Sequence, residues 1–221
     1  QLELGNTDSV RNEGIISIAS KLSKYKDKPM FDIEVLPSNI ILNDSAWNIG
    51  QARIAYSIAE KRMDITNFSL HTDYQSIIAN GTASELATDS IDVVLNNINL
   101  DYLLSYTEAS KAISIMGPVT GQAQVYSVFS APMLEAQAQI RNGGLNGVYL
   151  GDVTAEARLD RENKTILIEG EAIDSTGHRV AEVTGKVIPA TKWWGLDISC
   201  DSVDISFIEF WTKDSIANPQ G

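Results

Sequence analysis

Few side chains in this 221-residue chain are suited to catalysis, because it contains only two histidines and one cysteine. His71 follows the apolar segment NFSL, His178 lies in the polar segment STGH, and Cys200 lies in the alternating run LDISC. Neither histidine has a Cys, His or carboxylate at metal-ligand spacing, and no His–Asn pattern accompanies the cysteine. We expect surface or structural roles for the histidines, and for Cys200 the role of a small core residue.

The common catalytic and nucleotide-binding motifs do not occur. The chain has no G-x-S-x-G, no P-loop and no G-x-G-x-x-G motif, and DRENK lacks the spacing of a calcium loop. Asp92, Asp197 and Asp204 recur in step with an internal repeat, which favours strand-end or solvent-facing positions over a catalytic carboxylate pair. We therefore predict that the protein is not an enzyme, and we expect no catalytic residue, metal site or cofactor.

The charge of the chain narrows the classes of partner. Its formal net charge is −12, and its lysines concentrate only in KLSKYKDK at 21–28, where Asp27 dilutes them beside a turn. Binding to phosphates requires clusters of Lys and Arg, so nucleic acid and anionic membrane surfaces are unfavourable partners. No apolar stretch approaches the ~18 residues of a membrane span, so none is expected in this segment.

The dominant period of the apolar residues is two, which is typical of half-buried β-strands. In LEAQAQI (134–140), for example, Leu134, Ala136, Ala138 and Ile140 alternate with polar residues. The residues predicted to share the apolar side of the strands are Ile54, Tyr56, Ile58, Met63, Ile65, Ile91, Val93, Leu95, Ala123, Val125, Leu134, Ala136, Ala138, Ile140, Val153, Ala155, Ala157, Leu159, Ile166, Ile168, Leu196 and Ile198.

Short polar turns separate these strands. Asn-Gly occurs at 80–81, 142–143 and 146–147, and DREN and DSTGH (174–178) supply two further turns. Strands joined in this way pair antiparallel as a meander, and no βαβ pattern is present. The fold class is therefore predicted to be all-β and antiparallel, with one or two short helices at 100–114 and 207–214.

An internal repeat sets the expected domain organisation. GTASELATDSIDVVLNNINLDYL (81–103) aligns with GKVIPATKWWGLDISCDSVDISFI (185–208) after one insertion. We expect residues 1–221 to form a single elongated β-repeat domain and to be a piece of a longer chain. Residues 1–49 would end a preceding unit, 50–116 would form one unit and 117–221 the next.

Several stretches resemble one family of envelope proteins. They are VLPSNIILNDSAWNIG (35–50), NFSLHTDYQSIIANGTAS (67–84) with INLDYLL after it, and above all GPVTGQAQVYSVFSAPMLEAQAQIRNGGLNGVYLGDVTAEARLD (117–160). They are similar to TamB, the translocation and assembly module family of the AsmA-like, bridge-like proteins. Ser127-Val128-Phe129-Ser130 departs from the pattern, because the family more often has a glycine before its Pro turn.

The resemblance implies a β-taco, which is a long antiparallel sheet folded lengthwise into an open groove with an apolar interior. The apolar residues named above would line this groove, and phospholipid acyl chains would occupy it. The resemblance also implies a location in the periplasm of a diderm bacterium, with the full-length protein anchored in the inner membrane. That protein would act with a TamA/BAM-type outer-membrane barrel in phospholipid transport or outer-membrane protein assembly.

The residues leave other functions open. A chaperone-like module could present sheet edges to unfolded outer-membrane strands by β-augmentation. A surface adhesin would instead need separate compact cores with a calcium or glycan site. The pair Trp193-Trp194 is equally ambiguous, since it could cap the end of a sheet or contact a further repeat or a partner.

Overall fold

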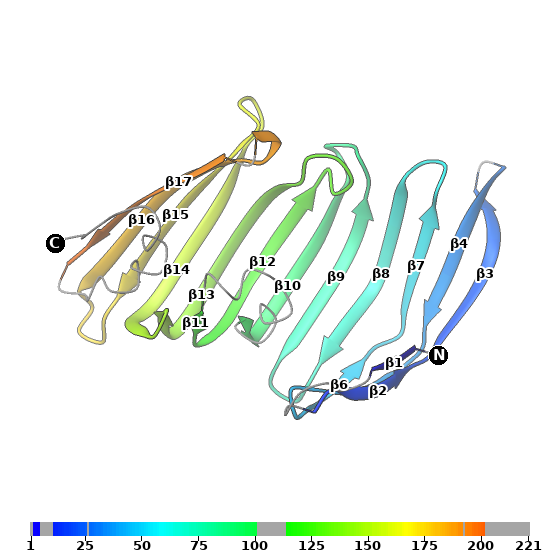
Figure 1. The fold of residues 1–221 in the computed structure, drawn as a ribbon, viewed down its shortest axis with the longest axis horizontal. Coiled ribbons are helices and arrows are strands. Elements are labelled where there is room, and N and C mark those ends of the chain that lie inside the picture. Colours follow the sequence, from blue (N-terminus) through cyan, green and yellow to red (C-terminus); the bar gives the residue numbers. More distant parts are fainter. Residues whose placement is uncertain (1, 5–10, 26, 101–113, 192, 202–221) are drawn as a thin grey trace. The chain divides into compact units, whose positions relative to one another are not determined.

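The computed structural model describes residues 2–4, 11–25, 27–100, 114–191 and 193–201, and most of these lie in β-strands (Figure 1). The strands are β1 (Leu2–Leu4), β2 (Glu13–Ile16), β3 (Ile18–Tyr25), β4 (Lys28–Val35), β5 (Ser38–Leu42), β6 (Ser45–Ile49), β7 (Ala52–Ser57), β8 (Arg62–His71), β9 (Ser76–Ala83), β10 (Ser90–Asn99), β11 (Ile115–Met116), β12 (Pro118–Tyr126), β13 (Met133–Leu145), β14 (Val148–Asp160), β15 (Thr165–Ile173), β16 (Arg179–Ile188) and β17 (Trp193–Cys200). A 3₁₀ turn, η2 (Pro189–Thr191), precedes β17.

The predicted fold class is confirmed. The described strands form an antiparallel sheet that does not close on itself. The helix expected at 207–214 lies outside the described residues. Of the helix expected at 100–114, only residues 100 and 114 are described.

The chain divides into two compact units. Unit 1 comprises Gln1–Asn96 and Gln122–Glu135, and unit 2 comprises Asn97–Gly121 and Ala136–Gly221. The proposed repeat boundaries at 1–49, 50–116 and 117–221 remain a prediction.

The meander of unit 1 is interrupted by one hairpin. Strands β3, β4, β7, β8 and β9 lie side by side in that order, although β5 and β6 intervene in the sequence between β4 and β7 (Figure 1). The β5–β6 hairpin instead pairs with β2 on one side and with β8 on the other. Strand β8 therefore pairs with β7 along Arg62–Thr66 and with β6 at Leu70 and His71.

Unit 2 contains an uninterrupted meander of β13 to β17. The β13–β14 turn is Asn146-Gly147, with φ of 50° and 84°, as a two-residue turn of type I′ requires. The β14–β15 and β15–β16 turns are closed by carboxylates at their first corners. Asp160 accepts hydrogen bonds from the Asn163 backbone and side chain, and Asp174 accepts them from Thr176 and the His178 backbone.

Two of the three Asn-Gly pairs are not turns, and here the sequence prediction was wrong. Asn80-Gly81 lies inside β9, and Asn142-Gly143 lies inside β13 at a register shift against β14. The Asn142 φ is 49°, and its N–H donates to the Asp152 carboxylate at 3.0 Å. At Asn142-Gly143 the physical reason is that a β-bulge uses the same left-handed residue as a tight turn, so this pair bends a strand without ending it.

Five buried apolar side chains of unit 1 come from neighbouring elements of its sheet. Val35, Ile40, Trp47, Ile49 and Ala52 come from consecutive strands β4 to β7, and each is at most 7% exposed. The β5–β6 hairpin thus contributes most of this cluster.

Gly151 and Gly177 both have positive φ but differ in the space around them. Substituting each of them tests how closely β14 and β15 approach each other at Gly151. Gly151 (φ 97°) lies where a Cβ would be 2.2 Å from the Ile173 carbonyl oxygen, whereas Gly177 (φ 85°) has no atom within 4 Å. We expect Gly177→Ala to destabilise by ~1 kcal/mol from its left-handed backbone alone. We expect Gly151→Ala to cost ~2 kcal/mol more, because the strands must separate.

The measurement is urea unfolding of the 221-residue chain followed by circular dichroism, with Gly177→Ala as the matched control. Equal losses for the two variants would contradict the close approach at Gly151.

Candidate functional site

The predicted apolar residues of unit 1 line up across its strands. Ile33 of β4 lies directly opposite Ile54 of β7, and Ile54 lies opposite Ile65 of β8. Gly81 and Ile91 continue this row on β9 and β10. Directly opposite residues in an antiparallel pair point to the same side, so these residues share one surface, which we term the apolar face of unit 1.

Unit 2 carries a longer set of rows. Ala138, Ala155, Gly170, Val183 and Ile198 lie opposite one another from β13 to β17, and they define the apolar face of unit 2. The neighbouring rows are Ala136, Ala157, Ile168, Gly185 and Leu196 on one side, and Ile140, Val153, Ala172, Ala181 and Cys200 on the other.

Most of these side chains are only partly covered. Among the residues predicted to share the apolar side, Ile166 is buried, and Ile58, Ala155 and Leu196 are exposed. The remaining predicted residues are half-buried. Ile58 differs further, since it lies in the turn after β7 and not in a strand. The two apolar faces are therefore not dry cores, and the lining of a lipid groove by the predicted residues remains a prediction.

One edge of the unit 1 apolar face is covered by the loop after β12. The Phe129 ring packs edge-on against the Tyr56 ring, with centroids 6.5 Å apart, and the Phe129 N–H donates to the Ser84 carbonyl at 3.1 Å. Ser127, which begins this loop, has a φ of 51°. The departure from the family pattern at 127–130 thus includes a position where glycine would be the less strained residue.

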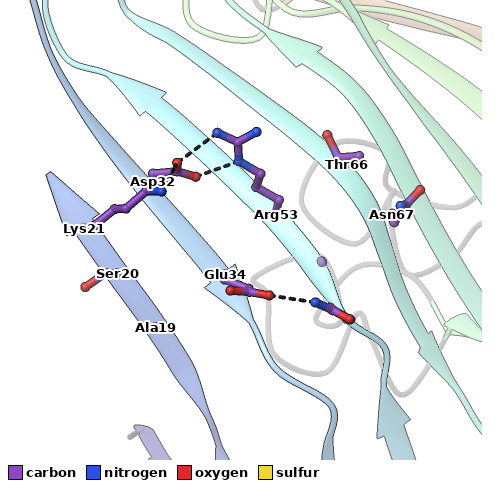
Figure 2. Close-up of a pocket in the computed structure, with 10 residues that line it drawn as sticks. Ala19, Ser20, Lys21, Asp32, Glu34, Arg53, Thr66 and Asn67 are labelled. Carbon is purple, nitrogen blue, oxygen red and sulfur yellow. Dashed lines mark hydrogen bonds and ion pairs between the residues drawn. The ribbon is translucent and has the colours of Figure 1, made fainter. Parts of the chain in front are cut away.

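The opposite face of unit 1 contains a polar pocket of about 600 Å³ (Figure 2). At its centre, the Arg53 guanidinium on β7 donates through Nε (2.7 Å) and Nη2 (2.8 Å) to the two oxygens of Asp32 on β4. Lys21 on β3 approaches the same carboxylate at 3.6 Å, and Gln51 donates to Glu34 at 2.6 Å. The pocket therefore contains a clamp that joins β3, β4 and β7.

The electrostatics of Asp32 fit a structural role. The Arg53 hydrogen bond is the main cause that lowers the pKa of the Asp32 carboxyl below its ordinary value; burial opposes this, and the charges of Arg53 and Lys21 add to it. Asp32 is only 8% exposed, so its charge depends on these partners. An acid that stays ionised and bonded at both oxygens is poorly suited to proton transfer.

A second clamp joins β8 and β9 on the same face. Arg62 donates to Asp64 at 2.9 Å and to Thr82 at 3.1 Å, and Thr82 donates to Asp64 at 2.6 Å. Arg62 also bonds Asp89 at 2.8 Å, just before β10 begins. The charged side chains at the centre of this face are therefore mutually paired.

The histidine and cysteine side chains among the described residues are His71, His178 and Cys200. Within these residues, no group of three or more His, Cys, Asp or Glu side chains is placed to hold a metal ion. No helix in the described part of the chain is long and apolar enough to cross a membrane. His71 is exposed at the end of β8, and burial raises the pKa of the half-buried Cys200 thiol, which weakens it as a nucleophile.

No family model matches the chain, and no curated protein and no solved structure shows a significant match to it. The similarity of residues 35–50, 67–84 and 117–160 to the TamB family therefore remains an expectation from the sequence, and the functions that it implies are proposals.

Sequence reasoning missed both polar clamps. Asp32 and Glu34 alternate with Phe31, Ile33 and Val35, and this pattern predicted only a solvent-facing side. The useful signal was opposite charges on neighbouring predicted strands. It becomes specific only once the register is known, because Arg53 lies opposite Glu34 and has Asp32 as its diagonal neighbour on the same face.

The clamp at Asp32 predicts a measurable titration. Arg53→Met should raise the pKa of the Asp32 carboxyl, because it removes the strongest hydrogen bond to the ionised form. Since the folded pKa is depressed, the stability from this group is present above its unfolded pKa of ~3.9 and is lost as the pH falls through the folded value. In Arg53→Met, the free energy of unfolding should therefore fall less as the pH is lowered.

The measurement is a pH titration of the Asp32 carboxyl by ¹³C NMR, with Lys21→Met as the control. The control should raise the pKa by less, because Lys21 contributes less than Arg53. An Asp32 pKa unchanged in Arg53→Met would show that the clamp does not persist in solution.

Proposed function

We propose that this chain is a non-enzymatic periplasmic bridge module of a TamB-like envelope protein. Its apolar faces would carry the acyl chains of phospholipids, support outer-membrane protein assembly, or do both. Full-length protein anchored in the inner membrane would reach a TamA/BAM-type barrel at the outer membrane. The observation that carries the proposal is the in-register apolar row that crosses each unit with half-covered side chains.

The register supports a continuous surface in each unit. From Ala138 to Ile198, every strand of the unit 2 meander contributes one apolar or glycine residue to the same row. An acyl chain needs such uninterrupted apolar contact, because one unpaired polar group on its path would cost several kcal/mol. A single surface of this kind could accommodate chains of different length.

The size of the side chains also supports the proposal. Ala136, Ala138, Ala155, Ala157 and Ala172 occupy positions where a tightly packed core would favour larger residues. Small side chains leave a shallow depression above the strands. Larger residues at the same face, Leu159, Val187 and Trp194, lie toward one end of these strands.

The opposite face explains how such a sheet stays hydrated. In unit 1 this face carries the ion pairs Asp32–Arg53 and Arg62–Asp64. In unit 2 it carries the exposed residues Gln137, Gln139 and Glu169. A sheet that is apolar on one side and charged on the other can hold lipid and face water at the same time.

The proposal predicts face-specific contact with lipid. A photoreactive phenylalanine derivative would replace Ala138 on the apolar face or Gln139 on the polar face, in the full-length protein in the cell envelope. Ala138 and Gln139 are adjacent on β13, where they lie opposite Ala155 and Thr154. They therefore point to opposite faces of the sheet at nearly the same place along the strand. We expect phospholipid adducts at 138 and at least tenfold fewer at 139, as measured by mass spectrometry of the crosslinked protein.

The same pair of variants distinguishes the competing function. Protein adducts at 139, with no lipid at 138, would overturn the conduit and favour the chaperone-like module. A second pair, at Ile65 and Asp64 on β8, tests unit 1 in the same way. Equal lipid labelling at both members of both pairs would show adventitious membrane contact and would also overturn the proposal.

A further inference from the structure

A shallow hollow of about 530 Å³ lies on the polar face of unit 2, opposite the proposed lipid surface. Trp193, Gly195 and Asp197 line it from β17, Thr184 and Lys186 from β16, and Leu167 and Glu169 from β15. Register places all of these on one side, because Gly195 lies opposite Lys186 and Lys186 lies opposite Leu167. The other lining residues are Ile168, Gly185 and Leu196, which alternate with these along the same strands and belong to a row of the apolar face.

The Trp193 ring reaches along its own strand to Gly195. A Cβ added at Gly195 would lie 3.0 Å from the ring atom Cη2 and 3.3 Å from Cζ2. The ring therefore occupies the space that any side chain at 195 would fill. Even so, Trp193 remains 51% exposed, so part of its side chain is open to solvent.

Four other residues that line the hollow can form hydrogen bonds. Glu169 and Asp197 are acceptors, Lys186 is a donor, and the Thr184 hydroxyl can act as either. The Glu169 charge is already offset by an ion pair with Arg158. Asp197 and Lys186 then contribute one charge of each sign, so the hollow favours neither a strongly anionic nor a strongly cationic ligand.

We propose that this hollow binds a neutral saccharide. A β-linked pyranose ring carries its hydroxyls in the plane of the ring and exposes C–H groups on its faces. One face could stack on the exposed part of Trp193, while the ring hydroxyls exchange hydrogen bonds with Asp197, Thr184 and Lys186. Leu167, 37% exposed, adds apolar contact for a ring substituent such as an acetyl methyl group. The volume suits one or two sugar rings.

This site is independent of the proposed lipid function, because it uses the opposite side of the same strands. Trp194 illustrates the separation: it is the next residue along β17, it is 61% exposed, and it lies opposite Val187 on the apolar face. It therefore provides a matched control for Trp193, with the same side chain on the same strand but on the other face.

The test is isothermal titration calorimetry of the 221-residue chain with chitotetraose, the β-1,4-linked tetramer of N-acetylglucosamine. We expect Trp193→Ala to weaken binding by about tenfold, equivalent to ~1.4 kcal/mol, and Trp194→Ala to leave it unchanged. Trp193→Phe should fall between the wild type and Trp193→Ala, because it retains an aromatic face. Asp197→Asn should weaken binding through loss of a charged acceptor.

Saturation-transfer NMR on the same samples should place the sugar C–H protons against the protein. Circular dichroism of each variant excludes loss of fold as the cause of weaker binding. Absence of binding by the wild type at millimolar chitotetraose would overturn the proposal. So would equal effects of the Trp193 and Trp194 variants, or binding of tetramethylammonium in place of the sugar, which would indicate a cation–π site.

Discussion

The structure depends on one constraint, which is the register of its antiparallel strands. Side chains alternate between two faces, so a slip of one residue would bring every charged group of a strand onto the apolar side. In unit 2 the row from Ala138 to Ile198 crosses the whole meander without such a slip. The two-residue turn at Asn146-Gly147 helps to fix it, because its conformation leaves little freedom in how β13 and β14 pair.

The two units differ in how the charged side chains are arranged on their polar faces. Unit 1 pairs its charges across strands, as in the clamp of Asp32 with Arg53 and Lys21. Unit 2 places like charges directly opposite each other, with Glu156 facing Glu169. Such pairs are unfavourable, and an ion pair from Arg158 to Glu169 offsets only part of the repulsion. Water that hydrates the like charges therefore stabilises the polar face of unit 2. The polar face of unit 1 is stabilised by its own ion pairs.

The sequence was sufficient for the fold class, because an all-β fold follows from a period of two. It was insufficient where one residue type serves two geometries. Asn142-Gly143 has the composition of a tight turn, but Asp152 on the partner strand captures the Asn142 N–H and turns the pair into a bulge. The Asp32 clamp and the Trp193 hollow were missed for a related reason. Each joins residues from different strands, and their proximity depends on register, which a one-dimensional pattern does not contain.

The size of the apolar residues bears on whether the apolar face of unit 2 is an ordinary core. Burial stabilises by roughly 25 cal/mol per Å² of apolar surface, so a face rich in Ala and Gly gains little from packing against a second protein layer. Such a layer would also have to exclude water from Leu196 and Trp194, which are 37% and 61% exposed. A flexible acyl chain fits a shallow surface better, because it can conform to depressions that rigid side chains would leave as voids. The small size of Ala138, Ala155 and Gly170 therefore favours the proposed acyl-chain surface over a closed core.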